Sequence, residues 1–369
     1  MKQTFFSIVF LSLALSNYAQ KYEFQTIKDI ACTPVISQGS TGTCWSFSST
    51  SFLEAEIIRT SGKKIDLSEM YNVRHTYPKK AWNYVMRQGK AQFSEGGLNH
   101  DVINSANQYG LVPNVVYSGL IGSADKHDHQ KMVAELEKLL KPYTDPEKKL
   151  GSKWKSEVTA ILDQYMGADI TEFTYEGRKY TPKSFLQMTK INLNDYVTIT
   201  SFTSEPYYAK FILDIPDNFS NGSFYNMPLD EFVANIDNAL DKGYTLALDA
   251  DVSEKTFSAK NGIAVVPENE ADKEAILTEI KPEKKITPEF RQQEFENFNT
   301  TDDHLMHIVG KVKNQAGSIY YKVKNSWGTK DVGNDGYIYM SLPYLKLKAI
   351  SVLVHKEALI NKTKKQLGI

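Results

Sequence analysis

Apolar and small residues recur at helical spacing in several segments, and the first of these begins at a cysteine. From Cys44 to Ile58 they occupy every third or fourth position, which predicts an amphipathic helix. The preceding turn at 38–42 contains Gly39 and Gly42, which permit the positive φ angles of a tight turn. The same spacing predicts further helices over residues 101–109, 130–141, 153–166, 181–190 and 228–241.

The pattern changes to alternation after residue 243. Residues 244–251 alternate in polarity as a strand does, and residues 311–324 predict a hairpin that turns at 314–317. A further predicted strand contains His304 and His307. Because successive side chains of a strand point to opposite faces, only one of these two histidines can line a given cleft.

Composition adds limits on size and on partners. With 369 residues, of which 41% are hydrophobic and 12% aromatic, the chain can bury a core large enough for two lobes. Its net charge of −1 gives no reason to expect nucleic acid or an anionic membrane as a partner. No internal apolar segment is long enough to span a bilayer, so no integral membrane segment is expected after removal of the N-terminus.

The first twenty residues have the organisation of a secretory signal peptide. Lys2 precedes an apolar run at 5–15, and small residues follow, ending at Ala19. The run is short for a spanning helix, which disfavours an uncleaved anchor. We therefore expect export, with the periplasm, the cell surface and the medium all left open as the destination.

A cysteine at the start of a helix is a candidate nucleophile. The unpaired amides and the dipole at that end favour the thiolate form of Cys44, although a lone cysteine is more often a small buried hydrophobe. Gln38 lies just upstream, where its side-chain amide and the Cys44 amide could together hold an oxyanion. The only other cysteine is Cys32, and a bridge between the two would consume the nucleophile, so we expect both to be free.

Downstream residues give that cysteine a context. His304 follows Asp303, Asn325 begins an Asn-Ser-Trp-Gly sequence, and the order Gln, Cys, His, Asn fits the Cys-His-Asn catalytic triad. On these residues the chain resembles the papain superfamily of cysteine peptidases. Three segments resemble its bleomycin hydrolase and bacterial aminopeptidase C branch; they are residues 194–199, 206–208 and 225–230.

The resemblance implies an α+β, papain-like fold of two lobes. One lobe would be helical and the other an antiparallel β-barrel-like lobe, with the active-site cleft between them and a helical insertion. We divide the chain into a signal peptide (1–20), a helical lobe with the nucleophile helix (21–124), a mainly helical insertion (125–243) and a β-rich lobe that carries the His and Asn and ends in a short tail (244–369).

The resemblance also implies roles for individual residues. Cys44 would attack a peptide carbonyl to form a thioester, and His304, which directly follows the Asp of the family's Asp-His pattern, would transfer the proton. Asn325 would orient His304, Trp327 would shield that hydrogen bond from water, and Gln38 would hold the oxyanion. His307 is then expected to be packed or to lie on the outer face of its strand.

No metal or organic cofactor is needed for this chemistry. His127 and His129 could suggest a metal site, but they lie on a predicted loop without a partner cluster, so we expect them to be exposed to solvent. Oligomeric state stays open, because the segment before the nucleophile is shorter than in the branch that the chain resembles.

Peptides are the expected substrates. By resemblance, the bare backbone of Gly96 and Gly97 would line the substrate groove. In the aminopeptidase C branch the C-terminal carboxylate lies in the cleft and pairs with the substrate's α-amino group, so Ile369 is a candidate for that role and we expect an aminopeptidase. Three alternatives remain: an endopeptidase or mixed specificity, an amidase or acyltransferase on a non-peptide substrate, and an inactive binding protein on the same scaffold.

Overall fold

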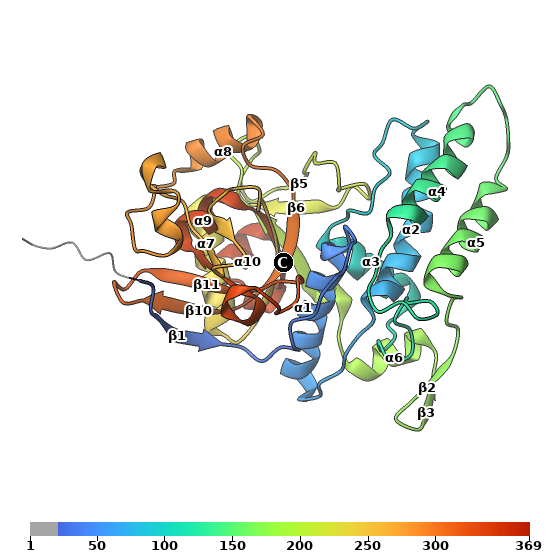
Figure 1. Cartoon of the computed structure of the whole chain (residues 1–369), viewed down its shortest axis with the longest axis horizontal. Coiled ribbons are helices and arrows are strands. Elements are labelled where there is room, and N and C mark those ends of the chain that lie inside the picture. The colour runs from blue at the N-terminus through green and yellow to red at the C-terminus, as the bar shows by residue number, and fades with distance from the viewer. Residues whose placement is uncertain (1–20) are drawn as a thin grey trace, which may run out of the picture.

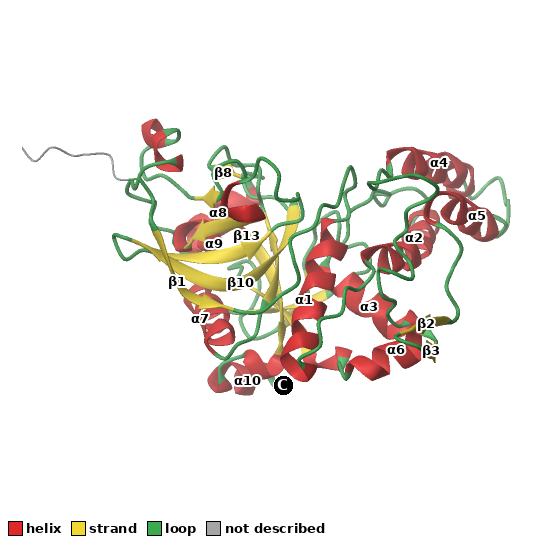
Figure 2. Ribbon diagram, turned by 60° about the horizontal axis from the view of Figure 1, so that its bottom comes forward, coloured by secondary structure: helices red, strands yellow, loops and turns green. Residues whose placement is uncertain are grey.

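The computed structural model describes residues 21–369, and it has two lobes on either side of one helix (Figures 1 and 2). The expected signal peptide lies outside the described residues. The central helix is α1 (Cys44–Ser61). One lobe contains α2 (Glu69–Met86), α3 (Asn99–Tyr109), α4 (Gln130–Leu140), α5 (Trp154–Met166), α6 (Pro182–Thr189) and the small hairpin of β2 (Phe173–Tyr175) and β3 (Arg178–Tyr180).

The other lobe is built on a mixed sheet, which has eleven strands among residues 21–369. In spatial order these are β5 (Lys210–Ile212), β6 (Ser223–Asn226), β4 (Tyr196–Thr200), β13 (Ala349–His355), β7 (Leu246–Ala250), β10 (His304–Asn314), β11 (Ile319–Lys324), β12 (Tyr337–Ser341), β9 (Ile263–Ala264) and β8 (Phe257–Ser258), with β1 (Phe24–Asp29) beside β10. Four helices accompany the sheet: α7 (Leu229–Asp241), α8 (Pro288–Glu296), α9 (Leu342–Lys348) and α10 (Asn361–Leu367).

The helices and strands expected from periodicity are confirmed, but the proposed division of the chain needs two corrections. β4 and β6, which fall in the expected insertion at 125–243, join the main sheet because β4 pairs with β13. β1 falls in the expected helical lobe at 21–124, yet it pairs with β10. Both strands pair with partners more than 100 residues away, and the pairing of distant strands is a tertiary choice that local patterns do not encode.

Helix α1 is buried along most of its length and not on one face alone. Every residue from Cys44 to Ile57 is buried, because the helix lies between the two lobes. It packs along β10, where the Ser48 hydroxyl donates to the Met306 carbonyl at 2.5 Å and Ser51 Oγ lies 2.9 Å from His307 Nδ1. These contacts hold the N-terminal half of α1 against the start of β10.

Two loop expectations are corrected by the structure. Gly39 has a φ of 68°, but Gly42 is not among the positive-φ residues; its missing Cβ instead makes room for Glu95, the nearest atom of which would lie 3.0 Å from an added Cβ. His129 is buried at 3% exposure, with its ring edge-on to Tyr77, so it is a packed residue and not a solvated one. Within residues 21–369 no set of histidine, cysteine and carboxylate side chains is arranged to hold a metal ion.

Glu283 gives the fold a pH-dependent weakness. Burial raises the pKa of its carboxyl to about 7, while it accepts hydrogen bonds from the Ser341 hydroxyl and the Val266 amide. An unfolded Glu ionises near 4.3, so this group penalises folding progressively as pH rises from about 4 to about 7, and fully above that. Glu283→Gln keeps the accepting oxygen, and we expect it to stabilise the protein by about 1–3 kcal/mol at pH 8.

Thermal unfolding at several pH values measures this effect. The gain should vanish near pH 4, where the wild-type carboxyl is protonated in both the folded and the unfolded states. Glu268→Gln, at an exposed position, is the matched control and should show no pH-dependent gain. A gain of equal size at pH 4 and pH 8 would contradict this explanation.

Candidate active site

The candidate nucleophile is held by the loop that precedes it. Cys44 is the first residue of α1 and its side chain is 7% exposed. Glu95 fixes the loop from the helical lobe: its carboxylate accepts from the Gly42 amide at 2.6 Å, and its carbonyl accepts from the Trp45 indole at 3.0 Å. Both cysteines of the chain are free thiols, as expected.

The candidate histidine and asparagine come from neighbouring strands. His304 begins β10, and Asn325 follows β11, the return strand of the predicted hairpin. His304 Nε2 lies 2.7 Å from Asn325 Oδ1. The same oxygen accepts the Ser326 amide at 2.7 Å, so it is an acceptor and Nε2 is the donor. Nδ1 is then the unprotonated nitrogen of His304 and is available to take a proton.

Trp327 covers the histidine from solvent. Its ring centroid lies 4.7 Å from that of His304 with an angle of 31° between the planes, and Trp327 as a whole is 39% exposed. An aromatic ring in this position limits the access of water to the imidazole, and a hydrogen bond in a drier environment is stronger. His307, by contrast, points toward α1, where it contacts Ser51 and is 1% exposed.

The thiol lies beside the start of the strand that carries the histidine. Leu305, which directly follows His304 in β10, packs in the same buried cluster as Cys44, and its backbone favours the thiolate form. Burial nevertheless raises the pKa of the Cys44 thiol to about 12 and lowers the pKa of His304 to about 4. Burial thus outweighs the helix dipole that favoured a thiolate. The resting pair is therefore neutral, and the thiolate forms when the proton passes to His304.

The candidate oxyanion donor, Gln38, is buried and fixed at both ends of its amide. Its Nε2 donates to the Thr41 carbonyl at 2.7 Å, and its Oε1 accepts the Ser326 hydroxyl at 2.5 Å. The amide nitrogen carries a second hydrogen that this contact does not use. Ser326 therefore connects the oxyanion loop to Asn325, a contact that the sequence motif did not reveal.

The two glycines of the expected substrate groove lie in different environments. Gly97 is buried, and a Cβ built on it would contact the Trp45 indole at 3.1 Å. Gly96 is half-buried, and the carboxylate of Asp217 occupies the space where its Cβ would be. Asp217 belongs to the loop 213–222 between β5 and β6, so this loop covers the backbone at Gly96.

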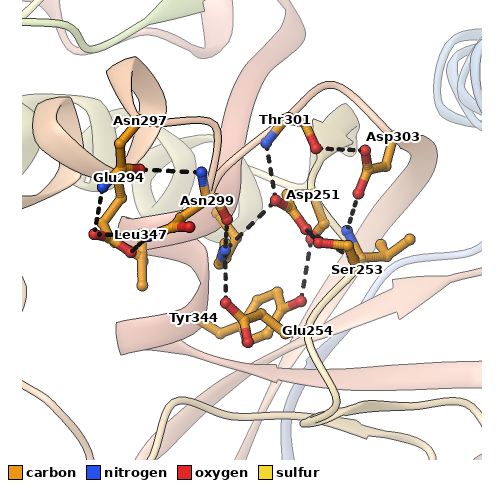
Figure 3. Close-up of polar contacts among 12 residues, drawn as sticks. Asp251, Ser253, Glu254, Glu294, Asn297, Asn299, Thr301, Asp303, Tyr344 and Leu347 are labelled. Carbon is orange, nitrogen blue, oxygen red and sulfur yellow. Dashed lines mark hydrogen bonds and ion pairs between the residues drawn. The ribbon is translucent and has the colours of Figure 1, made fainter.

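Figure 3 shows the network that fixes the chain immediately before the histidine. The Thr301 amide donates to the Asp251 carboxylate at 2.8 Å, and the Thr301 hydroxyl donates to Asp303 at 2.7 Å. Asp303 in turn accepts the Val252 amide at 3.3 Å. Asp251 also forms a fully buried ion pair with Lys348 at 3.4 Å. Asp303, the Asp of the Asp-His sequence, therefore holds the segment that precedes β10, and its hydrogen bonds go to Thr301 and Val252 and not to the imidazole.

Three acidic residues beside the thiol were not identified from the sequence. Burial is the main cause of the raised pKa of Cys44, and the negative charges of Asp302, Asp217 and Asp249 raise it further. Asp249 had a signal that could have been used, because it is an acid in the otherwise apolar strand β7. Asp302 stands two residues before His304. Asp217 had no such signal, because only the folding of its loop brings it to Gly96.

Asn325 gives a testable prediction at this site. Asn325→Ala removes the acceptor that fixes His304 with its proton on Nε2, so we expect kcat to fall by roughly 10- to 1000-fold. Steady-state kinetics on a peptide substrate measures the loss, and thermal unfolding checks the fold. A loss as large as that caused by removal of the nucleophile would contradict an orienting role.

Comparisons with known proteins identify the family of this chain. The model of the Peptidase C1-like family matches residues 11–368. Aminopeptidase G of Lactobacillus delbrueckii subsp. lactis is 24% identical over 88% of this chain and 81% of its own length. Aminopeptidase E of Lactobacillus helveticus is also 24% identical, over 89% of this chain and 82% of its own.

A plant relative and a crystal structure add to this picture. The probable cysteine protease RD19B of Arabidopsis thaliana is 33% identical, but over only 29% of each chain. The crystal structure of PepW from Lactobacillus rhamnosis covers 93% of this chain and 84% of its own, with a TM-score of 0.71 and 19% identity. The fold is accordingly the papain-like α+β fold that the sequence predicted. From the match over nearly its whole length, the chain belongs to the Peptidase C1-like family.

Proposed function

We propose that this protein is a cysteine aminopeptidase that acts through Cys44, His304 and Asn325. The observation that carries the proposal is the 2.7 Å contact between His304 Nε2 and Asn325 Oδ1. The contact leaves Nδ1 of His304 free to accept a proton. An inactive binding protein on this scaffold would have no need of that arrangement.

The chemistry follows from these positions. The Cys44 proton passes to His304 Nδ1 as the sulfur attacks the peptide carbonyl, and Gln38 and the Cys44 amide stabilise the oxyanion. When the C–N bond breaks, His304 gives that proton to the leaving amine, and a thioester remains. Water then attacks the thioester, gives a proton to His304 and releases the acid. The thiolate regains its proton from His304.

Two observations favour an aminopeptidase over an endopeptidase. Two relatives that align with more than four fifths of this chain are named aminopeptidases. In addition, loop 213–222 sets Asp217 on the backbone of Gly96, where an extended substrate upstream of the cleaved bond would pair. A groove closed on that side admits the first residue of a peptide and excludes longer upstream chains.

A substrate panel tests the proposal. It contains aminoacyl-coumarin amides, the same compounds with N-acetyl groups, and unblocked and blocked peptides. We expect cleavage of the unblocked compounds, with loss of activity on acetylation. Equal cleavage of blocked peptides would indicate an endopeptidase, and cleavage of non-peptide amides alone would indicate an amidase. Absence of turnover on the whole panel would indicate a binding protein.

The C-terminal tail is not the element that closes the groove. Residues 361–367 form α10, which packs on α7 through a hydrogen bond between Asn235 and the Thr363 hydroxyl. Ile369 lines a cavity with Asn104 and Tyr196, and the lining of that cavity includes none of the proposed catalytic residues. The expectation that the Ile369 carboxylate enters the cleft is therefore corrected.

Deletion of residues 365–369 follows as a prediction. The deletion removes the end of α10, including Leu367, which packs on the core, but it spares Thr363 and its hydrogen bond with Asn235. Because none of the deleted residues is placed in the cleft, we expect the ratio of activity on free and N-acetylated substrates to stay within about twofold of wild type. The measurement is kcat/KM for both substrates on the truncated chain. Gain of activity on the acetylated substrate would restore the tail as the specificity element.

We also propose export of the mature protein, on the strength of the residues at 1–20 alone. Within residues 21–369 no helix combines the length and apolarity of a membrane span. Expression of the full chain followed by N-terminal sequencing of the product tests export. A product found in the culture medium or the periplasm and lacking about twenty residues would support it, and an intact N-terminus inside the cell would refute it.

A further inference from the structure

A buried carboxyl group on the sheet faces the thiol from the side opposite the helical lobe. Asp249 in β7 pairs directly with Leu305 in β10, so the two side chains lie on the same face. Ala247, two residues earlier on that face, and Leu305 both pack in the hydrophobic cluster that contains Cys44. Asp249 is therefore directed toward the start of α1.

Asp249 is 0% exposed, and neither of its oxygens has a hydrogen-bond donor among residues 21–369. Its neighbour is another acid: Asp302 lies close enough for the two carboxyl groups to share a proton. Burial raises the pKa of Asp302 to about 7 and that of Asp249 well above its usual range. Among residues 21–369, both oxygens of Asp249 and one oxygen of Asp302 are buried acceptors without a donor, and a buried carboxyl pair without donors calls for a cationic partner.

Asp217 is the third acid of this group, because its negative charge raises the pKa of both Asp249 and Asp302. We call these three side chains the acidic pocket. Asp217 has partners of its own: Gln92 Nε2 donates to it at 3.1 Å, and Lys80 is its main favourable charge. Lys80 also donates to the Gly96 carbonyl. Lys80 and Gln92 thus partly offset the burial of Asp217, whereas neither oxygen of Asp249 has a donor among residues 21–369.

We propose that the acidic pocket binds the α-ammonium group of the substrate's first residue, with Asp249 and Asp302 as its acceptors and Asp217 as the wall that stops longer chains. The inference rests on the proposed aminopeptidase function and names the groups that produce its specificity. An ammonium group supplies the donors and the single positive charge that the pair lacks. No distant chain terminus is needed for this recognition.

The geometry favours an α-ammonium over a basic side chain. A lysine or arginine side chain in this pocket would belong to the residue before the cleaved one, whose backbone would have to pass Gly96. Asp217 occupies that space. The α-ammonium group, by contrast, is separated from the scissile carbonyl by one carbon atom, so its partner must lie close to the Cys44 sulfur. Asp249 lies on the face of β7 that packs with Cys44, because it pairs with Leu305, and the charges of all three acids raise the pKa of that thiol.

The experiment compares Asp249→Asn and Asp302→Asn with wild type. Asparagine keeps the size of the side chain and removes the charge. The substrates are leucyl-coumarin amide, its N-acetyl form, acetyl-Lys-Ala-coumarin amide and acetyl-Ala-Ala-coumarin amide. Loss of a charged hydrogen bond is worth about 1.5–3 kcal/mol, so kcat/KM on the unblocked substrate should fall roughly 10- to 150-fold, mainly through KM. Activity on the acetylated compounds should not fall.

Controls separate binding from folding. Asp214→Asn changes an exposed carboxylate on the loop that carries Asp217 and should leave all four activities unchanged. Thermal unfolding and far-UV circular dichroism show whether each variant is folded. Asp302 is less buried than Asp249, so its variant carries the test if Asp249→Asn does not fold.

Two results would overturn the proposal. The first is a folded Asp302→Asn variant whose kcat/KM on leucyl-coumarin amide stays within twofold of wild type. The second is a selective loss on acetyl-Lys-Ala-coumarin amide, which would assign the pocket to a basic side chain. If wild type showed no preference for unblocked substrates, the aminopeptidase function itself would fail, and that outcome is distinct from both.

Discussion

Replacing Cys44 with alanine is expected to lower peptide hydrolysis by a factor on the order of 10⁴–10⁶, which removes measurable turnover. The sulfur is the only atom at the start of α1 that can form the thioester. The Cys44 side chain makes no hydrogen bond that would be lost among residues 21–369, and alanine is the best helix former, so the fold should persist. Single-turnover experiments should detect no acyl-enzyme.

Cys32→Ala provides the matched control. Cys32 is the other free thiol of the chain, and its sulfur contacts the Tyr337 hydroxyl at 3.7 Å, away from His304. We expect this variant to keep wild-type activity and to lose one alkylation site. An acyl-enzyme formed by Cys44→Ala would mean that another group is the nucleophile.

Much of this site was predictable because each residue carries a local signal. The spacing after Cys44 predicted a helix that begins there, and the structure begins α1 at that residue. The hairpin after His304 predicted that Asn325 would return to it, and the two side chains are in hydrogen-bond contact. The alternation of side chains along the strand predicted that His304 and His307 point to opposite faces, so that only one of them lines the cleft. These inferences need only the period of an element and the length of a turn.

The parts that could not be predicted depend on contacts between distant segments. The protonation state of Cys44 was expected from the helix end alone, yet burial by both lobes reverses it. The tail was given a role by the resemblance to the aminopeptidase C branch, but its helix packs on α7. Asp217 reaches Gly96 only because β5 and β6 join the main sheet. Burial and long-range pairing set all three outcomes.

The neutral resting pair also bears on how the enzyme would be used. A thiol with a pKa of about 12 reacts slowly with alkylating agents, because the thiolate is the reactive form. Binding of a substrate in the cleft replaces water by the substrate carbonyl beside Gln38. Because the resting site is neutral, the oxyanion donors stabilise negative charge only when it develops in the transition state. Activation is thereby coupled to occupancy of the cleft.

The second large effect is expected at His304, and its neighbour His307 makes the comparison decisive. His304→Ala removes the base that takes the thiol proton and the acid that protonates the leaving amine. We expect kcat to fall by a factor on the order of 10⁴–10⁶, as for Cys44→Ala. His307 lies on the other side of the strand, where it contacts Ser51. Burial lowers the pKa of His307 well below its usual range, and the positive charge of Lys324 lowers it further.

His307→Gln should therefore affect stability more than catalysis. Glutamine can accept the Ser51 hydroxyl, but it leaves space beside α1, so we expect a loss of about 1–3 kcal/mol in the free energy of unfolding and a change in kcat of less than about tenfold. Kinetics and thermal unfolding on both variants give the ranking. If His307→Gln abolished turnover in a folded protein while His304→Ala did not, His307 would be the proton carrier. The 2.7 Å contact between His304 and Asn325 would then be a structural hydrogen bond.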